Sequence, residues 1–458
     1  MSSALRITFL SVLLGTTLLL PVAGTPLGAA CTWAVCVTVL ARSHRNGLLS
    51  LACLYLSLLG LFHLGLVVPT ALGVTGATPP DWMRSSHLQT ALVLFSVASA
   101  AFTLGARLLA PARREDPAFS LGAQPQLFWV GALVAAIGAT FLWVGVLQLD
   151  LMSSSYGAYW ERAMSEDVRF FGFGLMLFPI GLLVAAVGAT PGRMFALGGL
   201  VLVVLGPLFL RGFRGPIIVH VAALLAIWDR KDARVARRVA VAVVLAVMVL
   251  VPAIRVSRDL GPGGPSDLGT IDPVAVLLET GGSLRPVVVT AERIERGAEP
   301  LWMGQSYAMA VGRILPNVGA WARPGGHTLS PSAWATMHAE PWIFEHGGGI
   351  GFSGVAEPYL NFGTIGVVLF FLLLGLAIQS WDRWLSRDPF RAAIGAATFG
   401  FVLWTVRNDS VEVFRAAAFA SATVLAAWIA CRIRRPRAPA VGAVGFDPAA
   451  AHASERSG

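Results

Sequence analysis

Apolar residues gather along this chain into long runs, separated by short stretches rich in charge, glycine and proline. Most runs approach about 20 residues, the length at which an α-helix crosses the hydrocarbon core of a bilayer. The pattern predicts an all-α polytopic fold with about twelve transmembrane helices. The expected spans are residues 7–23, 27–41, 48–72, 87–109, 126–147, 170–189, 194–210, 215–228, 239–255, 362–381, 390–406 and 411–431.

Composition supports a membrane protein and removes one alternative. The 458 residues are 56% hydrophobic and only 13% charged, whereas a soluble domain usually carries about 25% charged residues. The formal net charge of +9 would suit nucleic-acid binding, but the cytoplasmic loops of membrane proteins also collect arginine and lysine. We therefore expect the lipid bilayer as a partner, and no nucleic acid.

The basic loop residues predict an orientation, because they fall on one face when the N-terminus is placed inside, and the positive-inside rule makes that face cytoplasmic. Both termini then lie in the cytoplasm. Residues 1–431 form a single multi-pass domain, and the tail 432–458 is expected to be disordered. The run 7–23 could also be a signal peptide, but the spans orient consistently if it is kept as a first helix. The basic loop residues are Arg42, Arg45, Arg113, Arg114, Arg193, Arg230, Lys231, Arg234, Arg237, Arg238, Arg383 and Arg387.

Cysteine and histidine spacing predicts neither a metal nor a cofactor. All four cysteines lie in apolar runs, where they are expected to pack as small hydrophobic residues. His338 and His346 are separated by seven residues, which matches no familiar zinc pattern. For each histidine we expect a hydrogen-bonded structural role.

The stretch FLRGFRGP, residues 209–216, places Arg211 and Arg214 inside an otherwise apolar run. An arginine at the bilayer centre costs roughly 2.5–3.5 kcal/mol on insertion scales. The predicted topology moves the pair to the outer face, between the seventh and eighth helices, where orientation does not account for it. The two side chains would project together if a helical turn persists there. The alternative is a surface turn whose arginines reach lipid headgroups.

One large extramembrane segment, residues 256–361, is expected on the periplasmic side between the ninth and tenth helices. Arg255 and Arg258 form a second i,i+3 pair where the ninth helix emerges. Short helices are expected at 273–280 and 285–296, with Glu292 and Arg296 as a surface pair. The following tryptophans suit an interface belt or sugar stacking.

The end of this segment contains glycines and polar residues directly before the tenth helix. Gly349 and Gly351 allow backbone to approach a ligand closely, and Glu357, Tyr359 and Asn361 follow. A carboxylate near arginine pairs at the mouth of a bundle is the pattern expected of a site for an anionic substrate. A further outer turn, residues 407–415, could line the same cavity, although mutual ion pairing is expected there.

Two of these stretches together resemble the Wzy-type oligosaccharide repeat-unit polymerases, which make O-antigen or exopolysaccharide in bacterial membranes. They are RGFRG, residues 211–215, and GIGFSGVAEPYLNFGTIGVVLFFLLLG, residues 349–375. The resemblance implies a GT-C-like membrane glycosyltransferase of the bacterial inner membrane. Its substrate would be an undecaprenyl-diphosphate-linked oligosaccharide, and a flippase and a chain-length regulator would be pathway partners.

The resemblance also implies roles for the residues. Arg211, Arg214, Arg255 and Arg258 would bind the diphosphate leaving group, which guanidinium groups suit because they bind phosphate oxygens bidentately. Glu357, or His338 as second choice, could activate the acceptor hydroxyl. Sugar or loop contacts would come from Tyr359, Asn361, Gly349 and Gly351.

Two alternatives stay open at this point. An O-antigen ligase or another glycosyltransferase for lipid-linked sugars would use the same arginine chemistry with a different acceptor. A flippase or secondary transporter belongs to another class. Transporters often show internal repeats, and we find no self-similar halves in this sequence.

Overall fold

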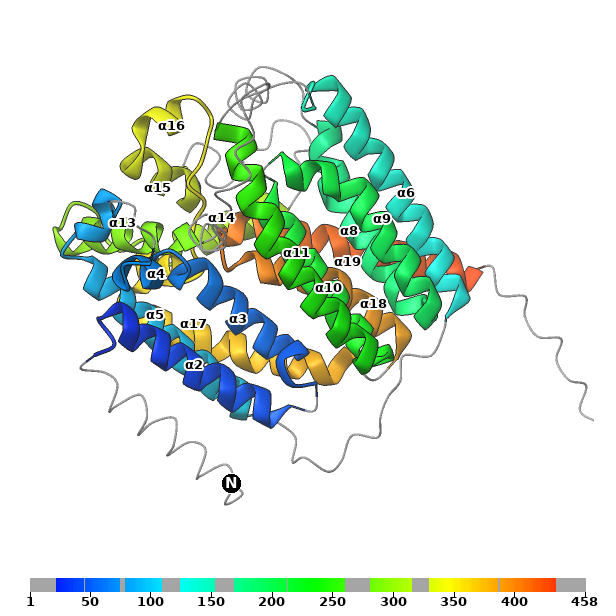
Figure 1. The fold of residues 1–458 in the computed structure, drawn as a ribbon, viewed down its shortest axis with the longest axis horizontal. Helices are drawn as coiled ribbons and strands as arrows, with labels where there is room; N and C mark the ends of the chain where they lie inside the picture. The colour runs from blue at the N-terminus through cyan, green and yellow to red at the C-terminus, as the bar shows by residue number, and fades with distance from the viewer. Residues whose placement is uncertain are drawn as a thin grey trace, which may run out of the picture.

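The computed structural model describes residues 22–44, 46–74, 79–108, 124–152, 169–211, 213–259, 281–314, 329–385 and 388–433. Every regular element within these residues is a helix, and a group of short helices lies at one end of a bundle of long ones (Figure 1). The bundle helices are α2 (Pro26–Ser43), α3 (Leu51–Leu64), α5 (Leu88–Leu108), α6 (Pro125–Gln148), α8 (Arg169–Gly188), α9 (Pro191–Leu210), α10 (Arg214–Lys231), α11 (Ala233–Asp259), α17 (Ala356–Leu385), α18 (Pro389–Trp404) and α19 (Ser410–Ile433). The short helices are α4 (Val67–Ala71), α13 (Leu284–Glu295), α14 (Gln305–Ile314), α15 (Pro331–Ala339) and α16 (Pro341–Glu345).

The structure confirms the all-helical class, and the length and apolar composition of its helices support a multi-pass membrane protein. Each of the expected spans from 27–41 onward falls on a helix or helix pair, and the span 48–72 is divided between α3 and α4. Among the described residues, seven helices are long and apolar enough to cross a bilayer, and α3 and α18 are shorter apolar helices. The span 7–23 lies almost wholly outside the described residues, as does the expected tail from residue 434, so the total of twelve stays a prediction.

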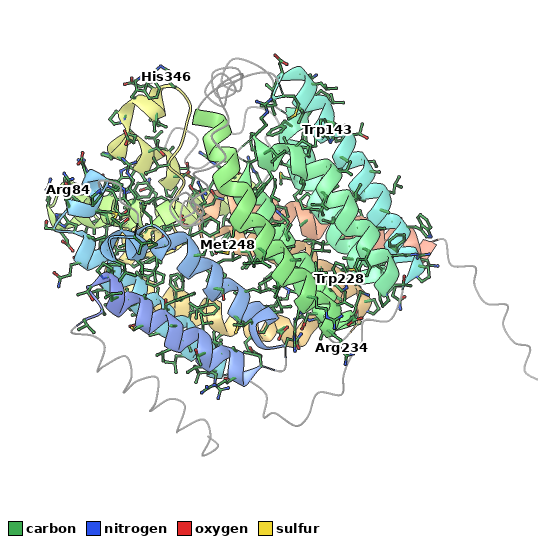
Figure 2. The ribbon with its side chains drawn as sticks, in the orientation of Figure 1. Arg84, Trp143, Trp228, Arg234, Met248 and His346 are labelled. Atoms are coloured by element: carbon green, nitrogen blue, oxygen red, sulfur yellow. The ribbon has the colours of Figure 1, made fainter. Side chains whose placement is uncertain are left out.

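Successive long helices run in opposite directions, which gives the bundle two distinct ends. At one end, which we call the basic end, Arg230 of α10 pairs with Asp382 of α17. The Lys231 Nζ there donates to the carbonyls of Val187 and Ala189, at 2.9 Å each. The opposite end, which we call the loop end, holds the starts of α17 and α19 and the short helices α13–α16. Figure 2 labels Arg234 and His346 near the basic and loop ends respectively.

The pair α6 and α8 packs backbone against backbone. Glycine recurs at every seventh position on both helices, at 131, 138 and 145 and at 174, 181 and 188. A Cβ added at any of these six positions would lie 2.2–2.6 Å from an atom of the facing helix. Because lipid provides no hydrophobic drive for helix association, close van der Waals contact through small residues is what holds such a pair together. Helices α5 and α17 also make close backbone contact through glycine, because a Cβ on Gly105 would lie 2.0 Å from the Leu372 carbonyl oxygen.

Helix α17 begins at Ala356, six residues before the expected start of the tenth span. Its helical geometry is interrupted at Phe362 (φ −137°, ψ 15°) and Gly363 (φ 62°, ψ −155°). Only glycine adopts the Gly363 conformation without strain. The expected start therefore coincides with a kink, and the residues before it form an additional helical piece that carries Glu357, Tyr359 and Asn361 to the loop end.

Candidate active site

The candidate site lies at the loop end, where residues 349–361 meet the short helices and the start of α19. The structure brings together the expected residues Gly349, Gly351, Glu357, Tyr359 and Asn361 in this region. Gly349 is exposed and Gly351 half-buried, whereas the side chains of the other three are buried.

The Gly-Phe-Ser-Gly stretch, residues 351–354, is a backbone joint between α17 and the α18–α19 turn. Gly351 has φ +77°, a value that favours glycine. The Phe352 amide donates to the Arg407 carbonyl at 2.8 Å. A Cβ on Gly354 would lie 2.6 Å from the Thr405 carbonyl oxygen, so only glycine permits this approach. The motif thus fixes where α17 begins relative to α18.

Ser353 fixes this joint to α3 as well. Its hydroxyl accepts from the amides of Val355 and Ala356, at 3.0 and 3.4 Å, and so caps the start of α17. The same oxygen lies 2.7 Å from Nε2 of His63, whose Nδ1 lies 2.8 Å from the Leu59 carbonyl oxygen. Since a carbonyl only accepts, Nδ1–H is the donor and Nε2 accepts from the serine hydroxyl. Sequence reasoning missed His63, and its only signal is a polar residue inside an apolar run.

Glu357 is only 4% exposed, and protein donors engage both of its carboxylate oxygens. Oε1 accepts from the Ser306 hydroxyl of α14 at 2.7 Å and from the Ser410 hydroxyl of α19 at 2.5 Å. Oε2 accepts from the Ser410 amide at 2.8 Å. Three segments of chain therefore meet at one carboxylate. Neither serine was anticipated from the sequence.

Asn361, whose side chain is fully buried, extends this network one helical turn further along α17. Its amide nitrogen donates to the Ser306 hydroxyl at 2.7 Å and to the Glu357 carbonyl at 2.8 Å. Its amide oxygen accepts from the Gly304 amide at 3.0 Å, and its backbone carbonyl accepts from the Met303 amide at the same distance. Asn361 thereby holds the segment that leads into α14.

A tyrosine of α14 closes the same corner. The Tyr307 ring stacks on Phe362 and on Phe370 of α17, with centroids 6.3 Å away in both cases. Burial, and secondarily the nearby Glu357 carboxylate, raises the pKa of the Tyr307 hydroxyl, so this side chain stays neutral. It acts here as an aromatic packing group along α17.

Asp409, completely buried, joins two helix starts. Its Oδ1 accepts from the Glu412 amide at 3.3 Å, as the N-cap residue of α19. Its Oδ2 accepts from the Ser332 amide in the first turn of α15 at 3.0 Å. Mutual ion pairing in this turn is confirmed for Arg415 and Glu412, 2.5 Å apart, whereas Asp409 binds backbone amides.

His338, the second expected base, lies half-buried on α15. Its Nδ1 is 2.9 Å from the Trp334 carbonyl oxygen, so Nδ1–H donates and Nε2 is the acceptor of the neutral ring. The ring packs on Trp334. The Trp334 indole in turn donates to Glu299 at 3.3 Å, and Trp302 donates to the same carboxylate at 2.8 Å. His346 repeats the arrangement, with Nδ1 2.8 Å from the Trp342 carbonyl oxygen. The expected structural hydrogen bonds of both histidines are therefore present.

The expected arginines lie at helix ends. Arg211 is exposed and is the C-cap residue after α9, and Arg214 begins α10 after a short turn, so the two do not share one helical turn. Arg255 and Arg258 lie within the last turns of α11. The side chains of Arg214, Arg255 and Arg258 lie outside the described residues. The expected pair of Glu292 and Arg296 is present at 2.6 Å.

No group of three or more histidine, cysteine, aspartate or glutamate residues suited to a metal ion occurs among the described residues.

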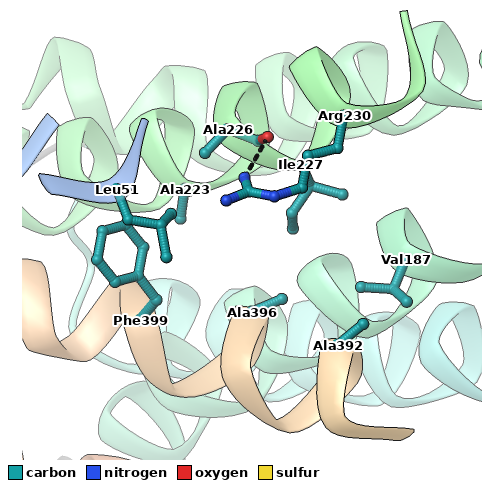
Figure 3. A pocket seen from close by; sticks show the side chains of 9 residues that line it. All are labelled: Leu51, Val187, Ala223, Ala226, Ile227, Arg230, Ala392, Ala396 and Phe399. Atoms are coloured by element: carbon teal, nitrogen blue, oxygen red, sulfur yellow. Dashed lines mark hydrogen bonds between the residues drawn. The ribbon is translucent and has the colours of Figure 1, made fainter. Parts of the chain in front are cut away.

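A small cavity at the basic end differs from the candidate site in its lining. Its lining is apolar apart from Arg230, which donates to the Ala226 carbonyl oxygen at 2.8 Å (Figure 3). Because that cavity lies at the opposite end of α17 from Glu357, it does not belong to the candidate site.

Comparison with known proteins adds one finding. A family model described as O-antigen polysaccharide polymerase Wzy matches residues 4–435, nearly the whole chain. The matched range includes both arginine pairs and every residue assembled at the loop end. Searches of curated proteins and of solved structures found no match.

Proposed function

The chain belongs to the O-antigen polysaccharide polymerase Wzy family, and on that premise we propose that it joins undecaprenyl-diphosphate-linked repeat units at the periplasmic face of the bacterial inner membrane. Membership makes the chain a glycosyltransferase-type polymerase that acts on lipid-linked oligosaccharide repeat units in a membrane. The proposal adds the carrier lipid, the side of the membrane and the residues.

The observation that carries the proposal is the position of the arginines. The C-terminal end of α10 is at the basic end, where Arg230 meets Asp382, so its first residue, Arg214, is at the loop end. Helix α11 returns antiparallel from the turn at Asp232. It has 27 residues against 18 in α10, which makes it about 13.5 Å longer at 1.5 Å per residue, so its last turns also reach the loop end. Both arginine pairs are therefore carried to the end that holds the short helices.

Arginine suits this place chemically. A lipid-linked diphosphate is an anion at the membrane surface, and guanidinium groups bind its oxygens while remaining charged beside lipid. In the proposed step the bond between the anomeric carbon of the growing chain and its diphosphate breaks, and a glycosidic bond forms to a hydroxyl of the new repeat unit. The hydroxyl proton passes to a base, and undecaprenyl diphosphate leaves with the negative charge that Arg211, Arg214, Arg255 and Arg258 stabilise.

Of the two expected bases, His338 has the more suitable geometry. Its Nε2 can accept a proton while Nδ1–H stays bound to the Trp334 carbonyl oxygen. The Glu357 carboxylate is buried and engaged by three donors. We therefore propose His338 as the proton acceptor, with Gly349 and Gly351 as backbone contacts for sugar.

The test is an elongation assay with purified protein and lipid-diphosphate-linked repeat units. Arg211→Ala, Arg214→Ala, Arg255→Ala and Arg258→Ala should each slow elongation by roughly 10²–10³-fold, the usual cost of losing one donor to a developing anion. Arg296→Ala is the control, because that arginine is exposed and pairs with Glu292 one helical turn earlier on α13, an interaction expected to contribute little. Normal long-chain product from all four variants would refute the proposal, and transfer only to a lipid acceptor that carries no repeat unit would indicate a ligase.

A further inference from the structure

We propose that Glu357 and Asp409 form a carboxylate latch that docks α14 and α15 onto the start of α19, so that Glu357 is a positioning residue of the polymerase. The inference concerns the candidate site itself, and only its activity measurements rest on the proposed function.

The bonds of Glu357 link α14 to α19 through one carboxylate. Ser306 lies 51 residues before Glu357 and Ser410 lies 53 residues after it, yet both hydroxyls donate to Oε1. The Ser410 amide lies at the start of α19, where the N–H groups have no carbonyl partner within the helix. Oε2 of Glu357 accepts from this amide. A carboxylate so placed satisfies the helix start and is favoured by the helix dipole. A general base must reach the substrate proton, and a carboxylate that is 4% exposed and engaged by three donors is poorly placed for that.

Asp409 provides the second half of the latch by linking α15 to α19. Its two oxygens accept amides from the first turns of both helices. His338 lies on α15 six residues after Ser332, whose amide Asp409 holds. The position of the proposed base is therefore set by Asp409 through a single short helix.

Apolar packing depends on the same latch. Met309 and Ala310 of α14 form a small buried cluster with Val411 of α19. This cluster lies next to the Glu357 hydrogen bonds on both helices, because Ser306 is one helical turn from Ala310 and Ser410 adjoins Val411. If α14 separates from α19, the buried face of Ala310 becomes accessible. A cysteine at this position therefore reports docking independently of any reaction.

The docking test uses Ala310→Cys in a full-length protein whose native cysteines, Cys31, Cys36, Cys53 and Cys431, are replaced by serine. With Glu357 present, the thiol should react with a water-soluble maleimide at least tenfold more slowly than a fully exposed thiol. Glu357→Gln should keep this protection. Its amide oxygen can accept from the Ser410 amide, and its nitrogen can donate to the serine hydroxyls. Glu357→Leu should increase the reaction at least tenfold, and Glu292→Gln, a surface carboxylate of α13, is the matched control.

Asp409→Asn separates the two halves of the latch. Asparagine still caps α19, but its nitrogen cannot accept from the Ser332 amide. A thiol at Ala335→Cys, a fully buried position of α15, should then become reactive while the thiol at 310 stays protected. Elongation by Asp409→Asn should fall in kcat at nearly unchanged KM, because His338 is displaced and the arginines are not.

The elongation assay distinguishes a positioning residue from a base. Glu357→Gln should retain at least a third of the wild-type rate with the same pH profile, because an amide can replace a positioning carboxylate but cannot accept a proton. A loss of 100-fold or more with the thiol at 310 still protected would overturn the proposal and make Glu357 the base. Equal protection of that thiol in Glu357→Leu and in the protein that retains Glu357 would also overturn it. If the wild-type protein does not elongate repeat units, the proposed function fails while the thiol measurements still decide the latch.

Discussion

Substitution of a glycine at the contact between α6 and α8 should lower the free energy of unfolding, and the magnitude of the loss can be worked out from the structure. In Gly138→Ala the new Cβ would lie 2.3 Å from the Phe178 amide nitrogen and 2.7 Å from the Phe178 Cα. Both are backbone atoms, so no side chain can rotate away. Contact at about 3.5 Å then requires the helices to separate locally by about 1 Å.

A separation of that size is costly in a pair held by van der Waals contact. A gap of about 0.5–1 Å forfeits roughly a quarter to a half of the dispersion energy of each contact that crosses it. Overpacked sites usually lose about 1–3 kcal/mol, and here the loss extends to neighbouring glycine contacts along both helices. We therefore expect Gly138→Ala to lower the free energy of unfolding by about 2–3 kcal/mol.

The measurement is reversible unfolding of the purified protein in mixed micelles, followed by tryptophan fluorescence. Gly199→Ala is the matched control, because Gly199 lies inside α9 and a Cβ there would meet no atom within 4 Å. Alanine is the better helix former, so this control should gain about 0.5–1 kcal/mol. Equal changes in the two variants, or a stabilised Gly138→Ala, would refute the account of α6–α8 packing.

The remaining predictions concern the loop end and the orientation of the bundle. Asn361→Leu removes three side-chain hydrogen bonds and should lower the free energy of unfolding by about 3 kcal/mol, at about 1 kcal/mol per bond. Asn408→Leu, outside that network, is the control. Equal losses in the two variants would contradict the stabilising role given to the Asn361 hydrogen bonds. Ser353→Ala removes the cap of α17 and should lose about 1–2 kcal/mol in the same unfolding assay, so an unchanged midpoint would count against the capping role. A cysteine at Met303, which is 72% exposed, should be labelled from the periplasm by a membrane-impermeant reagent, and one at Arg234 only after the membrane is opened; labelling of both from one side would overturn the topology. Elongation should proceed in EDTA, and restoration of activity by Mg²⁺ would refute the account based on arginine alone.

The helices of this protein could be predicted well from its sequence, and the reason is the solvent. Backbone polar groups in a bilayer must be satisfied within the helix itself, so apolar runs such as 126–147 and 170–189 become α6 and α8 almost residue for residue. The kink of α17 was not expected. It depends on Gly363 adopting a positive φ. Any glycine in the sequence could adopt such a φ, so the sequence does not show which of them will do so.

The candidate site was predicted in part. Glu357, Asn361 and the neighbouring glycines were identified because polar residues beside an apolar helix are unusual. Their partners were not, because Ser306, Ser410 and His63 are separated from them by dozens to hundreds of residues. Their side chains also carry no signal of their own. The seven-residue glycine repeat on α6 and α8 is visible in the sequence, but which helix faces it is not.

The sequence by itself therefore determined which segments become helices, which ends of them carry arginine, and that the chain belongs in a membrane. These properties depend on local composition and on transfer between water and lipid. Only the tertiary structure decided what the buried polar groups do, because a carboxylate such as Glu357 has different chemistry when it faces substrate than when three protein donors engage it. That difference is set by contacts between distant segments, which form only when the loop helices pack onto the bundle.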